Sequence, residues 1–477
     1  MTAENSHPRV LHLGLGNFHR AHQAVYTEDA ARAGETWQIT GVAGSTRGVV
    51  EALHRQDMRY SVVTLGPEQT DVRQVASITD AFVAADEPSR VVEEIADPAT
   101  RIVSLTVTEK GYGIAAGTRR LDTSAPGIRH DLEGHPPHST VGRLAAGLLR
   151  RSRGDGAPLT LLSCDNITAN GTTLAGLLRD FAEAMPPRDG AELLAFLDGS
   201  VSCPDTMVDR IVPATSDAHR RLAAEAGLSD QVPVPAEPFS MWVMSDSFAA
   251  GRPAWESAGA VLTDRVHDYE TVKVRLLNGC HSLLAYLGML TGRGLIAEAA
   301  ADPGIAAAAA RLGDEYVPTL TLPEGFDVPA YRKELDERFA NHRLAHGTVQ
   351  VGSDGSLKLA QRVPDAALWH LDRGRVPVML ALTVAAWLTC AARPGATAGG
   401  SADLPPDPAA ARLRELGEAA AAGGPAQRAR HLARACLQDE AFLGQQLGER
   451  QEFVDAVAEL LALLEDSGVT AALEATR

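Results

Sequence analysis

The first half of the chain alternates strand-like and helix-like sequence, and this alternation constrains the fold more than any other feature. Short runs rich in Val, Ile and Leu predict buried strands at residues 10–13, 38–42, 102–107 and 159–163. Gly, Asn, Asp or Thr follows each run, and helix-favouring sequence lies between them. Such alternation indicates βαβ units and a parallel sheet. We therefore predict an α/β fold for this half.

The sequence changes character near residue 264. Ala- and Leu-rich helical patterns dominate from there, for example at residues 306–312, 409–422 and 453–464. The apolar run 376–392 contains Pro and Thr and is short for a membrane span, so it predicts a buried helix. Residues 394–408 are rich in Gly, Pro and Ala and predict a surface loop. We expect a first domain over 1–263 and a mainly helical second domain over 264–477.

Composition narrows the possible partners and the compartment. The chain has 61 acidic and 44 basic side chains, a formal net charge of −17, which argues against binding to a phosphate backbone. Its five cysteines are odd in number and never form a C-x-x-C pair, as expected for reduced cytoplasmic thiols without a structural zinc site. The first ten residues lack the pattern of a signal peptide. We expect a cytoplasmic protein without a metal, membrane or nucleic-acid partner.

A glycine-rich turn follows the first predicted strand. The segment Leu13-Gly14-Leu15-Gly16-Asn17-Phe18-His19 has two glycines at the spacing that lets backbone N–H groups approach a pyrophosphate. His19 stands where the third glycine of G-x-G-x-x-G would be, so the turn alone is equally consistent with a tight strand-to-helix connection. Its place after the first strand of a long α/β region favours dinucleotide binding through Gly14, Gly16, Asn17 and Phe18.

The end of the second predicted strand bears on the choice of dinucleotide. An acidic residue there would favour NAD, but the sequence has Gly44-Ser45-Thr46-Arg47. Arg47 is suited to a 2′-phosphate, which leaves NADP open, and it is equally consistent with a solvated loop residue.

Two further predicted strands are followed by polar residues, and one acidic residue later in the chain is also a candidate ligand-binding position. Thr108-Glu109-Lys110 and Cys164-Asp165-Asn166 lie where open α/β sheets bind ligands, and Asp209 lies in a separate short segment. Each of these residues is singly consistent with an ordinary loop or helix cap.

The strongest chemical pattern lies in residues 268–281. At about 100° per residue, one stripe of a helix here carries four polar groups, and a separate arc carries Val272, Leu276, Cys280 and Leu283. The polar stripe consists of Lys273, Glu270, His281 and Asn278. Within a cleft, a lysine loses hydration and its pKa falls towards the range of a general base. The alternatives are a solvated surface stripe and a helix that ends at the turn-favouring pair Asn278-Gly279.

The same segment matches a different catalytic pattern. Tyr269-x-x-x-Lys273, with Ser257 upstream, has the spacing of the short-chain dehydrogenases. It comes more than 250 residues after the glycine turn, which itself lacks the wider glycine spacing of that family. This second interpretation is therefore the weaker one.

Together these segments resemble the polyol-specific long-chain dehydrogenases, such as mannitol 2-dehydrogenase and fructuronate reductase. The resemblance rests on LGNFHRAHQAVYT (15–27), SLTVTEKGYG (104–113), SCDNITANG (163–171), DTMVDRIVPAT (205–215), KVRLLNGCHS (273–282) and DGSLKLAQR (354–362). It implies a metal-independent, usually NAD-linked enzyme. It also implies a Rossmann-type N-terminal domain and a mostly helical C-terminal domain.

The resemblance also implies roles for individual residues. Lys273 matches the family's general acid/base, and Asn166 and Asn278 match the asparagines that hydrogen-bond the reacting oxygen. His281 matches the histidine that positions the substrate. Carboxylates that tune the lysine, or pass its proton to water, correspond to Asp209 and Glu270. Thr108 and Glu109 are expected beside the cofactor.

The substrate is less constrained. The TEKGY (108–112) and RHDLE (129–133) segments are more similar to fructuronate reductases, and Lys110, Lys358 and Arg362 are candidates to bind an anionic substrate or are solvated charges. Departures from the family pattern occur at Cys203, His342 and Ala360. Mannitol-1-phosphate 5-dehydrogenase and altronate oxidoreductase are alternatives within the family. A catalytically silent nucleotide-binding regulator is a remote alternative. We expect a small sugar, polyol or sugar acid as the partner.

Overall fold

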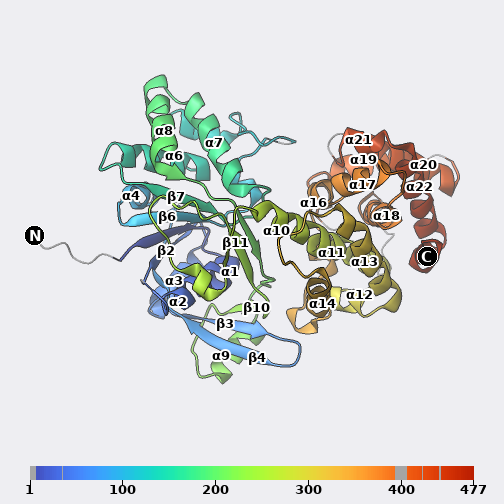
Figure 1. Ribbon diagram of the computed structural model, residues 1–477, viewed down its shortest axis with the longest axis horizontal. Helices are drawn as coiled ribbons and strands as arrows, with labels where there is room; N and C mark the ends of the chain where they lie inside the picture. Colours follow the sequence, from blue (N-terminus) through green and yellow to red (C-terminus); the bar gives the residue numbers. More distant parts are fainter. Residues whose placement is uncertain are drawn as a thin grey trace, which may run out of the picture. The chain divides into compact units, whose positions relative to one another are not determined.

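The computed structural model describes residues 7–34, 36–115, 117–392, 406–421, 423–439 and 442–476. Its internal contacts divide the chain into two compact units, Met1–His267 and Asp268–Arg477. We call these unit 1 and unit 2 and describe each separately (Figure 1).

Unit 1 is built on a six-stranded sheet with the strand order β5-β2-β1-β6-β7-β8, in which every pairing is parallel. Numbered by occurrence within this sheet, the order is 3-2-1-4-5-6, the Rossmann arrangement, so the predicted fold class is confirmed. The strands are β1 (Arg9–Leu13), β2 (Gln38–Ala43), β5 (Ile78–Val83), β6 (Thr100–Leu105), β7 (Leu159–Ser163) and β8 (Val201–Ser202). All four predicted strands are present, although β6 ends at Leu105 rather than at residue 107.

Helices cover both faces of this sheet (Figure 1). Successive strand residues point to opposite faces, so Val10 belongs to one apolar cluster while Leu11 and Leu13 belong to the other. The cluster of Leu11 is covered by α4 (Pro88–Ala96), α6 (Thr140–Ser152), α7 (Asn170–Ala184) and α8 (Pro187–Ser200). The cluster of Val10 contains α2 (Gln23–Ala30) and α3 (Arg47–Arg55). Unit 1 also contains α1 (Asn17–Ala21), α5 (Pro126–Leu132) and α9 (Asp217–Glu225).

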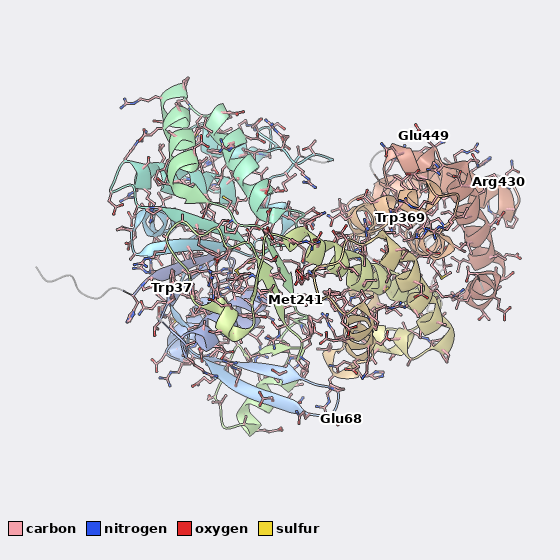
Figure 2. All side chains as sticks on the ribbon, in the orientation of Figure 1. Trp37, Glu68, Met241, Trp369, Arg430 and Glu449 are labelled. Carbon is pink, nitrogen blue, oxygen red and sulfur yellow. The ribbon has the colours of Figure 1, made fainter. Side chains whose placement is uncertain are left out.

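Two small sheets complete unit 1. One has the order β10-β3-β4 and the other β12-β11-β9. Their strands are β3 (Tyr60–Leu65), β4 (Thr70–Val75), β9 (Thr206–Asp209), β10 (Val234–Ala236), β11 (Met241–Met244) and β12 (Val261–Leu262). Figure 2 labels Glu68 in the turn between β3 and β4, and Met241 at the start of β11. The antiparallel pairing of β9 with β11 places Asp209 opposite Met241.

The regular secondary structure of unit 2 is helical in its described ranges, apart from an isolated bridge between Leu295 and Gly347. Its centre is formed by α11 (Cys280–Leu290) and α18 (Val378–Ala392), which pack against each other and bury nearly every side chain. The predicted buried helix over 376–392 is therefore confirmed from Val378 on, whereas Val376 precedes the helix and is exposed. Within it, the Thr383 and Thr389 hydroxyls donate to backbone oxygens four residues earlier, which removes the penalty of burying them.

The other helices of unit 2 surround this pair. They are α12 (Ile296–Ala300), α13 (Pro303–Tyr316), α14 (Val328–Phe339), α15 (Thr348–Gly352), α16 (Gly355–Arg362), α17 (Pro364–Leu371), α19 (Ala410–Ala419), α20 (Pro425–Gln438), α21 (Gln445–Gly448), α22 (Gln451–Asp466) and α23 (Gly468–Ala475). Figure 2 labels Arg430 and Glu449, two exposed charges of this outer layer. Helix α19 is shorter than the predicted 409–422, and most of the predicted loop 394–408 lies outside the described residues.

Two further predictions concern the whole chain. Across the described ranges, we find no helix with both the length and the apolarity that crossing a bilayer requires. All five cysteines lie in described segments as free thiols, and four of them are buried.

Candidate active site

The glycine turn lies where the strand order of the sheet reverses, between β1 and β6. Gly14 has a φ of +106°, and a Cβ at this position would lie 2.1 Å from the backbone oxygen of Thr106. The backbone nitrogens of Gly14 and Leu15 both donate to the oxygen of Val42 at the end of β2. Only glycine fits this conformation and this close approach. The turn therefore sits at the topological switch point, where open α/β sheets bind their ligands.

His19 takes the place of the missing third glycine and packs on another histidine. Its ring stacks on that of His12 with centroids 3.4 Å apart and planes 11° from parallel. His12 Nδ1 lies 2.8 Å from Ser104 Oγ and its Nε2 lies 2.9 Å from Thr106 Oγ1, while His19 Nδ1 lies 2.8 Å from Gln23 Oε1. Burial lowers the pKa of His12 well below its usual value and that of His19 to about 4. This neutral pair joins β1, β6 and α1 beneath the glycine turn.

The two residues after the glycines are held inside unit 1. Asn17 Nδ2 donates to the oxygen of Pro213 and to Thr215 Oγ1, and Asn17 Oδ1 accepts from Arg20 Nη2 at 2.7 Å. The Phe18 ring stacks on His22 with centroids 5.0 Å apart. Both side chains therefore anchor the segment that follows the turn, and the backbone of this segment is the part that can face a ligand.

Arg47 is the first residue of α3 and pairs with a carboxylate. Its Nε donates to Asp86 Oδ2 at 2.9 Å and its Nη2 donates to Asp86 Oδ1, although the Arg47 side chain is 60% exposed. Asp86 follows β5, the neighbour of β2 in the sheet. The two strand ends thus carry a bidentate ion pair, and the positive charge of Arg47 is already matched.

A half-buried carboxylate joins the ends of β6 and β7. Asp165 accepts from the backbone nitrogens of Val107 and Thr108 and from the Tyr112 hydroxyl. This explains why β6 is shorter than predicted. The Thr106 nitrogen still donates to the oxygen of Leu13 in β1, but the amides of Val107 and Thr108 donate to Asp165 instead of a neighbouring strand. Thr108 consequently adopts a φ of +65° and a ψ of 161°, a conformation that costs a β-branched residue about 1–3 kcal/mol.

Such strain gathers at ligand-binding positions. Thr108, Glu109 and Lys110 are exposed beyond Asp165, and Asn166 is exposed beside it. The carboxyl edge of the sheet therefore brings together the glycine turn, the Thr108-Glu109 segment and Asn166.

Asn170, which the motif analysis did not single out, connects this edge to β9. Its carboxamide donates to the backbone oxygens of Asp165 and Thr206 and accepts from the backbone nitrogen of Thr206. Asp209, at the other end of β9, is 4% exposed. The sequence signal for Asn170 was its place in SCDNITANG (163–171), one of the segments that carry the family resemblance.

In unit 2 the polar stripe lies on one continuous helical run. Helix α10 (Val266–Val272) leads into a π-helical segment, Lys273–Gly279, which leads into α11. The alternative that Asn278-Gly279 ends the helix is therefore wrong. Hydrogen bonds in a π segment reach back five residues rather than four, so the angles assumed for a regular helix do not hold over it. Such segments occur frequently at functional sites.

The π segment buries its lysine. Lys273 is 8% exposed and His281 is 7% exposed, whereas Glu270 and Asn278 are half-buried. The interpretation as a solvated surface stripe is therefore wrong for Lys273 and His281. The expected apolar arc of Val272, Leu276, Cys280 and Leu283 is buried as well. An amine at this depth loses much of its hydration, which is the condition for a lysine to act as a base near neutral pH.

Gly279 lets the helix pack closely. A Cβ there would lie 2.5 Å from the Tyr316 ring. Tyr269, the tyrosine of the short-chain dehydrogenase pattern, contacts Phe326 edge to face, with ring centroids 6.1 Å apart.

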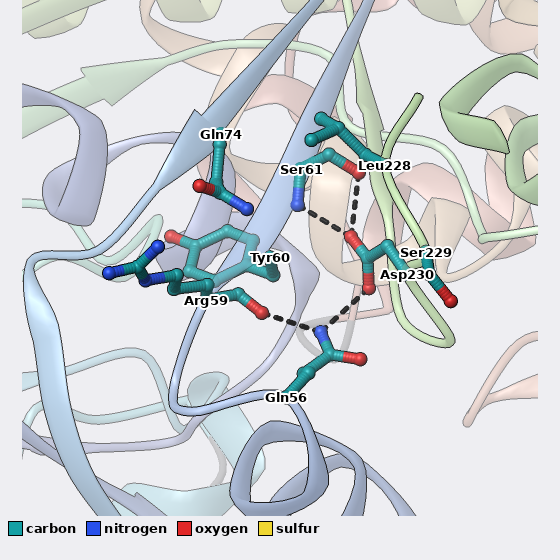
Figure 3. Close-up of a pocket in the computed structure, with 8 residues that line it drawn as sticks. All are labelled: Gln56, Arg59, Tyr60, Ser61, Gln74, Leu228, Ser229 and Asp230. Carbon is teal, nitrogen blue, oxygen red and sulfur yellow. Dashed lines mark hydrogen bonds between the residues drawn. The ribbon is translucent and has the colours of Figure 1, made fainter. Parts of the chain in front are cut away.

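A pocket elsewhere in unit 1 is built from structural contacts (Figure 3). In it, the Asp230 carboxylate accepts from the Ser61 backbone nitrogen and hydroxyl and from Gln56 Nε2. None of its lining residues lies at the carboxyl edge of the six-stranded sheet. Within the described ranges, no group of three or more His, Cys, Asp or Glu side chains is arranged to hold a metal ion.

Comparison with known families decides between the two dehydrogenase patterns. The mannitol dehydrogenase Rossmann domain matches residues 8–257, and the mannitol dehydrogenase C-terminal domain matches residues 265–464. The chain belongs to the mannitol dehydrogenase family. The resemblance to polyol-specific long-chain dehydrogenases is thus confirmed, and the short-chain interpretation of Tyr269 and Lys273 is wrong. Membership of this family makes the chain an oxidoreductase that acts on CH–OH groups.

Individual members of the mannitol dehydrogenase family align over most of their length. D-mannonate oxidoreductase of Escherichia coli is 41% identical over 389 residues, which are 80% of this chain and 79% of that protein. Mannitol 2-dehydrogenase of Cereibacter sphaeroides is 37% identical over 84% of each chain. The structure of Pseudomonas fluorescens mannitol 2-dehydrogenase, a ternary complex with NAD and D-mannitol, matches with a TM-score of 0.86 at 35% identity. That match covers 100% of this chain and 95% of the other.

Proposed function

We propose that this chain is an NAD-linked oxidoreductase that interconverts a 2-keto sugar or sugar acid with its polyol or aldonate, using Lys273 as the general acid/base. The observation that carries the proposal is the burial of Lys273 within a π segment of an otherwise regular helix. The names of the relatives, D-mannonate oxidoreductase and mannitol 2-dehydrogenase, indicate the two substrate classes. We propose residues 1–263 as the dinucleotide-binding domain and 264–477 as the substrate and catalytic domain.

The residues of unit 1 fit a dinucleotide. The Gly14 turn packs against the backbone of Thr106 at the switch point, and Gly16 two residues later is exposed and has no side chain, as close backbone approach to a pyrophosphate requires. We assign the cofactor to Gly14, Gly16, Asn17, Phe18, Arg47, Thr108 and Glu109. When bound, the nicotinamide supplies the hydride acceptor or donor. Because Asp86 already matches the charge of Arg47, the ribose end suits NAD better than the 2′-phosphate of NADP.

The protein's own residues transfer one proton and stabilise the charge on the reacting oxygen. In the oxidative direction, the neutral amine of Lys273 takes the proton of the substrate hydroxyl while the carbon beside it loses hydride. In the reductive direction, the Lys273 ammonium returns that proton to the carbonyl oxygen. A positioned acid/base of this kind contributes about 10²- to 10⁴-fold to the rate.

The remaining residues are assigned by the resemblance. Amide N–H groups of Asn166 and Asn278 stabilise the charge that develops on the reacting oxygen. His281 positions the substrate. Asp209 and Glu270 tune the lysine or pass its proton to water.

The direct test is an assay of the purified protein with NADH and NADPH against D-fructuronate, D-tagaturonate, D-fructose and D-fructose 6-phosphate. We expect oxidation of NADH with at least one of these ketoses, and slower oxidation of NADPH. Failure to oxidise either nucleotide with any of them would contradict the proposal.

A further inference from the structure

Four basic side chains of unit 2 gather around a fifth, the buried imidazole of His281. We call them the basic cluster, which consists of His281 on α11, Arg338 on α14, Lys358 and Arg362 on α16, and His346 on the loop before α15. Burial, followed by the electrostatic effect of His346, Arg362, Arg338 and Lys358, holds the pKa of His281 well below its usual value. The groups that act on this imidazole are thus all basic. Figure 1 labels α11, α14 and α16, the helices that carry all of these residues except His346.

The cluster is attached to the segment that carries the proposed chemistry. Arg362 Nη1 donates to the backbone oxygen of Asn278, the sixth residue of the π segment, at 2.9 Å. The same atom donates to Ser282 Oγ at 2.5 Å. Lys358 Nζ donates to the backbone oxygen of Val351 at 3.1 Å. These contacts hold Arg362 against the helical run of Lys273 and Lys358 against α15.

Two nitrogen atoms of the cluster are buried without a hydrogen-bond partner among the described residues. They are Nε2 of His281 and Nδ1 of His346. The rings meet edge to face with centroids 5.0 Å apart, and the Phe339 ring closes another side of His281 at 5.0 Å. A buried polar atom without a partner costs about 1–3 kcal/mol, so native proteins rarely keep one unless a ligand or water uses it.

We propose that the basic cluster binds a negatively charged end group of the substrate, so that the enzyme acts on ketoses with an anionic end in preference to neutral ones. Arginine and lysine bind carboxylate and phosphate oxygens through charge-assisted hydrogen bonds, and a neutral imidazole adds one further bond. This inference rests on the proposed function, since it names the substrate class of the same site. Carboxylate and phosphate share the required chemistry, and the experiment distinguishes them.

Steady-state assays with NADH test the inference by comparing kcat/KM for D-fructuronate, D-tagaturonate, D-fructose 6-phosphate and D-fructose. We expect at least one anionic ketose to exceed D-fructose by about 100-fold. In Lys358→Met and Arg362→Met, the ratio of kcat/KM for the preferred anionic ketose to that for D-fructose should fall about 10- to 100-fold. Lys333→Met, an exposed lysine on α14 with 82% side-chain exposure, is the matched control and should leave the ratio unchanged.

Calorimetric titration of D-fructuronate, D-fructose 6-phosphate and D-fructose into the wild-type protein without nucleotide gives a second readout. We expect at least one anionic ketose to bind more tightly than D-fructose, with the difference lost in the two variants. Equal or better use of D-fructose by the wild type, or equal losses on all ketoses in the variants, would overturn the inference. Preferential binding of an anionic ketose with no turnover would instead contradict the proposed function and leave the anion site standing.

Discussion

The proposed functional residues lie mainly in connections after strands in unit 1, but within a helix in unit 2. In unit 1 all of these residues except Asp209 lie beyond the ends of parallel strands, where Gly14 and Thr108 have positive φ and Asp165 accepts hydrogen bonds from two backbone amides. In unit 2 they lie inside an unbroken helical run, where a change of hydrogen-bond register, rather than a loop, accompanies the burial of Lys273. The comparison shows two ways of fixing a reactive group. One uses the end of a strand, and the other uses an irregularity within a helix.

The strand-end arrangement depends most on Gly14, and replacing it should have the largest effect on stability. In Gly14→Ala, the new Cβ meets a backbone oxygen that cannot move, and φ is unfavourable as well. We expect a loss of more than about 4 kcal/mol in unfolding free energy, or a folded protein whose NADH affinity falls at least about 100-fold. Thermal unfolding and NADH fluorescence titration measure both. Gly48→Ala, which has open space and no positive φ, is the control.

The buried pair His12 and His19 should make unit 1 sensitive to acid. Folding lowers the pKa of His19 from 6.5 to about 4, so the unfolded chain binds more protons between these values. Stability is therefore complete above pH 6.5, falls as the pH decreases below it, and stops falling near pH 4, a total of about 3 kcal/mol for His19. Unfolding measured from pH 7.5 to 4.5 should show a smaller slope in His19→Gln than in the exposed control His431→Gln. Equal slopes would contradict this.

The helical arrangement depends on close packing at Gly279. Ala in place of Gly in a helix usually adds about 1 kcal/mol, but the Cβ of Gly279→Ala would meet Tyr316 at 2.5 Å. We expect the cost of this steric overlap to exceed the gain in helix propensity, with a net loss of about 1–2 kcal/mol in unfolding free energy. Adding Tyr316→Phe should recover part of it, because the Tyr316 hydroxyl oxygen is 2.6 Å from that Cβ position. Gly176→Ala on α7, with open space around it, should not destabilise. A stabilised Gly279→Ala protein would show that the π segment has room to adjust.

The Arg47–Asp86 pair should have the smallest effect, confined to the choice of nucleotide. Asp86→Asn removes the carboxylate that matches Arg47 and leaves the guanidinium available to a 2′-phosphate. We expect kcat/KM for NADPH to rise several-fold while that for NADH changes less than about twofold. Asp198→Asn on α8, which removes the partner of Arg179, is the control. An unchanged NADPH value would exclude Arg47 from the ribose end.

Much of unit 1 could be predicted because its signals are local. A β-branched run followed by Gly14 or Asp165 marks a buried strand and its end, and the four strands found this way are the centre of the sheet. The stack of His12 on His19 could not be predicted, because nothing in their spacing shows that a turn brings the rings together. The early end of β6 likewise depends on Asp165, about sixty residues later in the chain.

In unit 2, by contrast, less of the candidate site could be predicted from the sequence. The polar residues of 268–281 were recognisable, but a regular helical wheel describes them poorly because residue type carries no signal for the π register. Of the basic side chains around α11, only His281, Lys358 and Arg362 were recognisable from the sequence. Arg338 and His346 come from other elements, and packing against α11 brings all of them around His281.

The most direct test of the central claim is single-turnover oxidation of NADH by Lys273→Ala with the best ketose, alongside Lys333→Ala and a titration of NADH binding. We expect hydride transfer to fall by about 10²- to 10⁴-fold, with NADH affinity within about twofold of wild type. A primary amine added to Lys273→Ala should restore part of the rate. A Lys273→Ala protein that transfers hydride at close to the wild-type rate would contradict the assignment of Lys273 as the acid/base.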